Sequence, residues 1–421
     1  MLHNQYMHDF NEKNNDEQGM SIEDGLQQEY TDFIEDVISK GYAERVPECQ
    51  LEGVKGRFGS YPHQQLIWVL TRFRQEQVAV MGDIRQMFYQ VKVASEDKDF
   101  LRFLWWPQGD TSQDPIEYRM TVHLFGAVSS PSCACFALRK TAEDNQGRFA
   151  KEVVETLLHN FYVDDCLKST ATEEEAITMI KDLMNICSKG GFQLTKWVSN
   201  SRVVIRAVDE IHRAKDWFEL DLDRDDLPLE RVLGLHWCVE KDVFQFKMIQ
   251  RERPLTRRGL LSYLSSMYDP LGFIAPISLP GKILLQELCR RKCGWDSELP
   301  PDIQQRWTKW FRDLPKLSEF KVGRCIKPCQ FKSPVKAQMH HFSDASENGY
   351  GAVSYLRLES GMDVHVAFLQ GKARVTPLKQ VTIPRLELTA AVLAVRMDNM
   401  LRAELQLSLE SSIFWTDSTS F

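Results

Sequence analysis

The chain has 421 residues, of which 43% are hydrophobic and 26% are charged, and its formal net charge is −7. This length exceeds one typical core and predicts two to four domains of an ordinary soluble globular protein. No run of 18 apolar residues and no basic-then-apolar leader is present, which excludes a membrane-spanning helix and a secretory signal and predicts a cytoplasmic protein, free or within particles.

The negative charge is concentrated at the start of the chain. Residues 1–50 contain 12 acidic and 3 basic residues, and the remainder contains 47 acidic and 49 basic residues. The net charge therefore does not exclude a nucleic-acid partner. Basic stretches at 251–258 and 290–292 suit phosphate groups, although a solvated helix face explains them equally well.

The N-terminal region divides into three parts. Residues 1–20 are polar and acidic and predict a disordered tail. Residues 21–45 predict a helix that stops near Gly41, because apolar side chains recur every three or four positions. These side chains are Tyr30, Phe33, Ile34, Val37 and Ile38. Residues 50–64 follow no such pattern, contain only Lys55 and Arg57 as basic residues, and are long enough for one short hairpin at most.

The next region alternates helices and strands. A helix is predicted over 65–75, followed by an apolar strand, 78–82, that delivers Asp83 to its end. Strands are then predicted over 101–106 and 116–122, with turn residues at 108–110 between them. A second helix is predicted to start near 129–131, where Pro131 suits the first turn.

The segment Asn160–Leu167 contains two adjacent carboxylates, Asp164 and Asp165, between apolar residues. We interpret it as a β-hairpin whose tight turn carries both acids. Burying two carboxylates together is unfavourable unless a cation joins them, so we expect Mg²⁺ there. With Asp83 on a second strand, three acids would form a two-metal site for phosphoryl transfer. An exposed acidic turn is the alternative.

The chain then continues in shorter elements. A helix is predicted from Thr172 to the stop at Gly190-Gly191, and a hairpin over 232–237. Residues 254–320 are predicted to be helical, with segments 255–264 and 282–291 separated by prolines. These prolines are Pro270, Pro276 and Pro280, and the tryptophans expected in the core are Trp295, Trp307 and Trp310.

A further acid set follows a linker predicted at 327–334. One strand ends at Asp344, a second spans 349–355, a helix opening near Arg385 carries Glu387, and a last strand ends at Asp417.

Taken in order, these motifs resemble a reverse transcriptase. The resemblance rests on the Asp83 strand and on segments 123–131, 162–165 and 191–197. Three flanking stretches are similar to the Pao/BEL branch of LTR retrotransposon polyproteins: Leu70–Gln75, Leu101–Trp106 and Tyr268–Phe273. The resemblance covers about residues 25–55 and 65–421, nearly the whole chain.

The resemblance implies an α/β (α+β) multidomain fold. It would contain a right-hand polymerase palm with reduced fingers, a helical thumb/connection and a truncated ribonuclease H-like domain. The implied boundaries are a tail over 1–20, an N-terminal helix and incomplete fingers over 21–64, the palm over 65–250, thumb/connection helices over 251–333, and the ribonuclease H-like domain over 334–421.

The resemblance also implies roles for residues in the palm. Asp83, Asp164 and Asp165 would hold two Mg²⁺, and Lys196 would donate a proton to the leaving pyrophosphate. Phe88 would exclude a ribose 2′-OH, with core packing as its alternative role.

Nucleic-acid contacts follow from the same resemblance. Phe125 and Gly126 would pack near the templating base pair. Leu233 and Gly234 would hold the primer, although an ordinary hairpin would look the same.

In the C-terminal region the resemblance implies a ribonuclease H site. Asp344, Glu387 and Asp417 would hold two further Mg²⁺ against an RNA strand. A fourth acid of the family has no match here, and we expect weak or absent cleavage of a hybrid and a marginally stable domain.

The predicted function is extension of a primer 3′-OH with dNTPs on an RNA or DNA template, with an incomplete ribonuclease H. The alternative is a catalytically inactive retrotransposon remnant that at most binds nucleic acid, which the reduced fingers favour. A phosphatase or nuclease using the same acids is a third reading. The sequence leaves the oligomeric state open.

Overall fold

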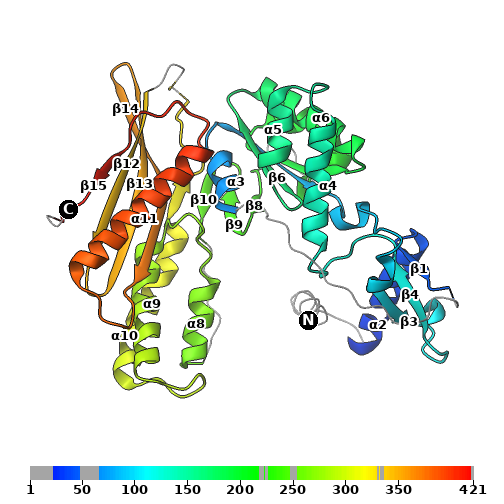
Figure 1. Ribbon diagram of the computed structural model, residues 1–421, viewed down its shortest axis with the longest axis horizontal. Helices are drawn as coiled ribbons and strands as arrows, with labels where there is room; N and C mark the ends of the chain where they lie inside the picture. Colours follow the sequence, from blue (N-terminus) through cyan, green and yellow to red (C-terminus); the bar gives the residue numbers. More distant parts are fainter. Residues whose placement is uncertain are drawn as a thin grey trace. The chain divides into compact units, whose positions relative to one another are not determined.

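The computed structural model describes residues 22–47, 66–217, 222, 226–246, 254–329, 331 and 336–418 (Figure 1). The predicted acidic tail (1–20) and the segment predicted to hold the reduced fingers (50–64) lie outside these residues. The chain forms two compact units. The first comprises residues 1–63, 84–158 and 184–193, and the second comprises 64–83, 159–183 and 194–421.

The first unit contains a small antiparallel sheet in the order β1-β4-β3. Its strands are β1 (Ala43–Arg45), β3 (Arg102–Trp105) and β4 (Ile116–Met120), and its helices are α2 (Ile22–Ser39), α4 (Ser130–Asp144) and α5 (Lys151–His159). The pair of strands predicted over 101–106 and 116–122 and the helix start near Pro131 are confirmed.

Helix α2 ends at the predicted stop. It ends at Ser39, and Gly41 takes a positive φ of 71°, which turns the chain into β1. Residues 43–45 are therefore a strand paired with β4, not helix. Of the predicted apolar stripe, Ile34 and Val37 are buried, whereas Tyr30 and Phe33 are 55% and 40% exposed.

The second unit begins with a four-stranded sheet in the order β5-β6-β2-β7. The strands are β2 (Val78–Ile84), β5 (Phe161–Tyr162), β6 (Asp165–Thr170) and β7 (Leu194–Ser199), and the nearby helices are α3 (Leu66–Phe73), α6 (Glu173–Lys189) and α7 (Arg202–Arg206). Buried apolar residues of α3 and the strands share one core, including Leu70, Phe73, Ala79 and Leu167. The helices predicted over 65–75 and from Thr172 are confirmed.

A second antiparallel sheet has the order β11-β10-β9-β8. Its strands are β8 (Leu229–Val232), β9 (Leu235–Cys238), β10 (Val243–Gln245) and β11 (Lys321–Gly323). The predicted hairpin over 232–237 is confirmed, because β8 and β9 pair around a two-residue turn with positive φ at Leu233 and Gly234.

Three helices follow: α8 (Arg257–Ser266), α9 (Ala275–Arg290) and α10 (Pro301–Asp313). The break predicted between the two helical segments is present, because α8 ends at Ser266 and α9 begins at Ala275. Only Pro270 lies within this break. Helix α9 begins earlier than predicted, with Pro276 in its first turn and Pro280 inside it. Trp307 belongs to the core as predicted. Trp295 does not, because it is 44% exposed, with the Arg257 guanidinium 4.0 Å from its ring centre.

The C-terminal sheet has the order β14-β13-β12-β15, and α11 lies along it (Figure 1). The elements are β12 (Lys336–Ala345), β13 (Gly349–Ser360), β14 (Asp363–Val375), α11 (Ile383–Glu404) and β15 (Ile413–Trp415). Strand β14 was not predicted, and the strand expected over 349–355 continues to Ser360. Among the described residues, no helix has both the length and the apolar character needed to cross a membrane.

Candidate functional site

The first group of acids is assembled by β2 and β6. These strands are antiparallel, and Asp83 at the end of β2 lies directly opposite Asp165 at the start of β6. The β5–β6 hairpin is fixed by Asn160, whose buried amide donates to the Leu167 carbonyl over 2.7 Å. The hairpin therefore brings Asp164 and Asp165 to the end of the strand that carries Asp83, as the sequence predicted.

The turn itself lies one residue earlier than predicted. Tyr162 pairs with Asp165, so Val163 and Asp164 form the turn and Asp165 already belongs to β6. Val163 has a φ of 56°, a left-handed conformation that is strained for a β-branched residue. Such strain is often stored where a turn must aim a functional side chain.

The acids of this first group perturb one another. Burial, followed by the charges of Asp164 and Asp83, raises the pKa of Asp165 to about 7. Burial also raises the pKa of Asp164, against the effect of a backbone hydrogen bond. Lys196 on β7 places its Nζ 3.1 Å from Asp83 Oδ2, with its side chain 60% exposed. Asp83, Asp164, Asp165 and Lys196 are thus interacting charges. Among the described residues, however, the three acids do not form a group whose oxygens lie close enough together to share a metal ion, so their role at a metal stays a prediction.

Gly82 makes room for Trp197, the neighbour of Lys196, and the sequence analysis did not predict this contact. A Cβ atom on Gly82 would lie 3.0 Å from the ring of Trp197, which is fully buried. The bare backbone at Gly82 lets this indole pack against β2, next to Asp83. Lys196 precedes Trp197 on β7 and has a positive φ of 54°, and its ammonium group pairs with Asp83, the residue after Gly82.

The residues predicted to contact the nucleotide belong to the first compact unit. Phe88 lies in a 3₁₀ turn (Met87–Gln90), is buried, and packs edge-to-face on Phe125 with ring centres 4.6 Å apart. Phe125 is 44% exposed, and Gly126 has a positive φ of 90°. Phe88 and Phe125 therefore come together, and their roles at the nucleotide stay predictions.

The predicted primer-binding turn at Leu233 and Gly234 is covered by Tyr268. A Cβ atom on Gly234 would lie 2.7 Å from the Tyr268 ring. Burial, and then the nearby Tyr162, raise the pKa of Tyr268. The sequence pattern did not predict this contact of Tyr268 with the turn, because Tyr268 stood out only as part of the Pao/BEL-like segment Tyr268–Phe273. The role of the turn itself stays a prediction.

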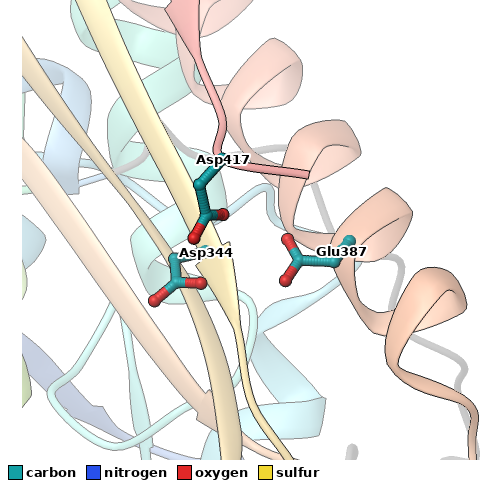
Figure 2. Close-up of side chains that lie close together, drawn as sticks. All are labelled: Asp344, Glu387 and Asp417. Carbon is teal, nitrogen blue, oxygen red and sulfur yellow. The ribbon is translucent and has the colours of Figure 1, made fainter. Parts of the chain in front are cut away.

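The second acid group forms at the C-terminal sheet. Strands β12 and β15 run parallel, with His340 opposite Ile413 and Phe342 opposite Trp415. Asp344 and Asp417 each follow by two residues, so the strands deliver both acids to one edge. Glu387, near the start of α11, points toward them (Figure 2). One carboxylate oxygen from each of the three residues lies within 4.8 Å of those of the other two.

These three carboxylates fit a hard cation. Burial, and then the charges of Asp344 and Asp417, raise the pKa of Glu387, and its Oε2 is buried without a hydrogen-bond partner. Within the described part of the chain, no Lys or Arg forms an ion pair with any of the three. An all-oxygen donor set with an unsatisfied buried oxygen suits Mg²⁺. Across the described residues, no other group of three His, Cys, Asp or Glu reaches this closeness.

Comparison with protein families gives two matches along the chain. Residues 45–197 match the family described as reverse transcriptase (RNA-dependent DNA polymerase). Residues 256–418 match the Pao retrotransposon-like RNaseH-like domain. No curated protein is detectably similar in sequence.

Two solved structures share the fold. The foamy viral protease-reverse transcriptase dRH in complex with ds DNA matches 92% of this chain with a TM-score of 0.53 and 13% identity. The foamy viral protease-reverse transcriptase in complex with an RNA/DNA hybrid matches 94% with the same score and identity. The chain spans 62% and 49% of those two proteins.

Proposed function

Because the chain joins a reverse transcriptase region, residues 45–197, to a Pao retrotransposon-like ribonuclease H-like region, residues 256–418, we propose that it is an RNA-directed DNA polymerase. It extends the 3′-hydroxyl of a primer with deoxynucleotides on an RNA or DNA template. The observation that carries this proposal is the pairing of Asp83 with Asp165 across β2 and β6, beside Asp164 and Lys196.

In this proposal Asp83, Asp164 and Asp165 hold the divalent ions of the polymerase site. Bound Mg²⁺ supplies activation of the attacking hydroxyl and neutralisation of charge at the leaving oxygen. The raised pKa values of Asp164 and Asp165 fit this assignment, because neighbouring carboxylates that resist ionisation bind a cation favourably.

Lys196 is the proposed proton donor to the leaving pyrophosphate. Its ammonium group is held 3.1 Å from Asp83 and remains largely solvent-exposed, so it can reach a bound phosphate. Phe88 is proposed to select the deoxyribose, supported by its packing with Phe125 near Gly126. The turn at Leu233 and Gly234 is proposed to hold the primer.

Nucleic acid is the proposed partner. The two foamy viral proteins that share the fold were solved with double-stranded DNA and with an RNA/DNA hybrid. We propose that this chain binds a template–primer duplex of either kind and uses dNTPs.

A second activity is favoured by the C-terminal acids. We propose that Asp344, Glu387 and Asp417 hold Mg²⁺ and act on the RNA strand of a hybrid. Their mutual closeness and the unpaired Glu387 oxygen support this assignment.

Primer extension on an RNA template with Mg²⁺ and dNTPs tests the polymerase proposal. Asp164→Asn should lower extension by at least ~10²-fold, because it removes a full charge from the ion-binding set. The matched control is Asp209→Asn, an exposed acid on the same unit, which should extend like the wild type. If the purified wild-type protein extends no primer, the inactive remnant is the correct reading.

A further inference from the structure

Two stretches that resemble Pao/BEL polyproteins take no part in the proposed chemistry: Leu70–Gln75 at the end of α3, and Tyr268–Phe273 before α9. Both lie in the second compact unit, as does the whole C-terminal sheet. Within this unit, both stretches contact the C-terminal sheet.

Arg74 is buried and reaches strand β14. Its guanidinium donates to the carbonyls of Phe368 and Leu369 over 2.8 and 3.0 Å, and to the carbonyl of Arg324 over 3.1 Å. Burial lowers its pKa to about 9, and among the described residues no carboxylate pairs with it. The charge of Arg74 is therefore stabilised by carbonyl dipoles, two of which belong to β14, and by the face of Phe273.

The neighbours of Arg74 bind the end of α11. Arg72 forms a buried ion pair with Glu404. The Gln75 side chain accepts from the backbone N–H of Gln406 over 2.7 Å and donates to the Glu404 carbonyl over 3.4 Å. The C-terminal end of α3 and the two residues after it thus contact both β14 and the end of α11.

The second stretch meets the same strand. The N–H of Gly371 on β14 donates to the Leu271 carbonyl over 2.8 Å, and the rings of Phe273 and Phe368 pack 5.0 Å apart. Gly272 lies so close to β14 that a Cβ atom would stand 1.8 Å from the Gly371 carbonyl oxygen. Only glycine fits there, and its φ of 79° also favours glycine.

We propose that Leu70–Gln75 and Leu271–Phe273 form a docking seam that fixes the ribonuclease H-like domain to the polymerase palm, with Arg74 and Gly272 as positioning residues. If β14 moved away, the buried guanidinium would lose two of its three carbonyl acceptors, which is unfavourable in a dry site. The seam therefore holds the β2–β6 acids and the β12–β15 acids at one fixed separation.

Variants at two glycine positions test the seam through a distance measurement that does not depend on enzymatic activity. Spin labels on non-natural residues at the exposed positions Glu174 and Arg396 report the separation of palm and C-terminal domain. Gly272→Ala should turn a single narrow distance distribution into a broad one. Gly361→Ala is the matched control, because Gly361 also has a positive φ, 62°, but no atom within 4 Å of an added Cβ. A narrow, unshifted distribution in Gly272→Ala would overturn the proposal.

Arginine variants give an independent test. Arg74→Met removes the charge and keeps most of the volume, and should broaden the same distribution, whereas Arg312→Met on the exposed face of α10 should not. If Arg74→Met does not fold by circular dichroism, Gln75→Ala, which removes only two hydrogen bonds, decides. An unchanged distribution in Gln75→Ala would then count against the seam.

A third readout rests on the proposed function. On an RNA/DNA hybrid with a recessed primer end, the wild type should cut the RNA within a narrow window from the primer terminus. Gly272→Ala should widen that window at least ~2-fold, while Gly361→Ala keeps it. Complete absence of cuts in the wild type would contradict the ribonuclease proposal, and the spin-label distances would still decide whether the seam exists.

Discussion

The two acid groups of this protein are built in different ways. At the palm, antiparallel strands oppose Asp83 and Asp165, and the chain supplies its own cation, Lys196, 3.1 Å from Asp83. At the C-terminal sheet, parallel strands and a helix bring Asp344, Glu387 and Asp417 within 4.8 Å, and no described basic side chain pairs with them. The palm acids are thus partly compensated by the protein, whereas the described part of the chain gives the C-terminal acids no such compensation.

The largest expected effect is at the uncompensated group. Glu387→Gln should lower hybrid cleavage by at least ~10²-fold, because it removes the buried carboxylate that faces the other two acids. Primer extension by the same variant should stay at the wild-type rate. Asp363→Asn, an exposed acid at the start of β14, is the control for cleavage. A parallel loss of both activities in Glu387→Gln would mean that the two groups are not separate sites.

The next effect concerns pH and stability without metal. The pKa of Asp165 is about 7 in the folded protein, well above the ordinary value of 3.8 for an aspartate. Its contribution to the stability of the folded state is therefore fully present below pH ~4 and is lost as pH rises through 7. In EDTA, Asp165→Asn should therefore stabilise the protein at pH 8 by on the order of 2–4 kcal/mol, and have little effect at pH 3.5. Thermal unfolding across this range measures it. A pH-independent difference would contradict the raised pKa.

Much of the palm site was readable from the sequence. An apolar strand ending in Asp83 and an apolar hairpin carrying Asp164 are local patterns, and both are present. The turn position was missed by one residue, because no sequence rule favours Val163 at a positive φ.

The rest depended on contacts distant in sequence. In strand β14 a polar side chain, Gln370, is fully buried, whereas the apolar Val364 and Val366 are more than half exposed. The alternation of polar and apolar residues that marks a half-buried strand is therefore missing from its sequence, and the strand could not be predicted. The partners of Arg74 lie almost 300 positions away and carry no local signal.

A smaller effect is expected from Gly82, which packs against Trp197 next to Lys196. Gly82→Ala places a methyl group 3.0 Å from the Trp197 ring, so the indole must shift and carry Lys196 with it. We expect a loss of about 1–3 kcal/mol in unfolding free energy and about 10-fold in extension. Hybrid cleavage should be unchanged. Wild-type extension by a folded Gly82→Ala protein would show that the position of Lys196 does not matter.

The smallest effect is the stability contributed by Lys196 itself. Its side chain is 60% exposed, so Lys196→Met should change the free energy of unfolding by no more than about 1 kcal/mol in denaturant titrations. Extension should nevertheless fall, because the proposed proton donor is gone. A large stability loss would mean that the pair with Asp83 is structural.

We propose that the two acid groups are independent cation sites, and that the negative charge of only the first is partly compensated by Lys196. Calorimetric titration of the metal-free protein with Mg²⁺, in the absence of nucleic acid, tests it most directly. We expect Asp344→Asn to remove the tighter class of Mg²⁺ binding and leave the weaker one, and Asp164→Asn to remove only the weaker class. Unchanged Mg²⁺ binding in Asp344→Asn, or loss of all binding in either single variant, would contradict it.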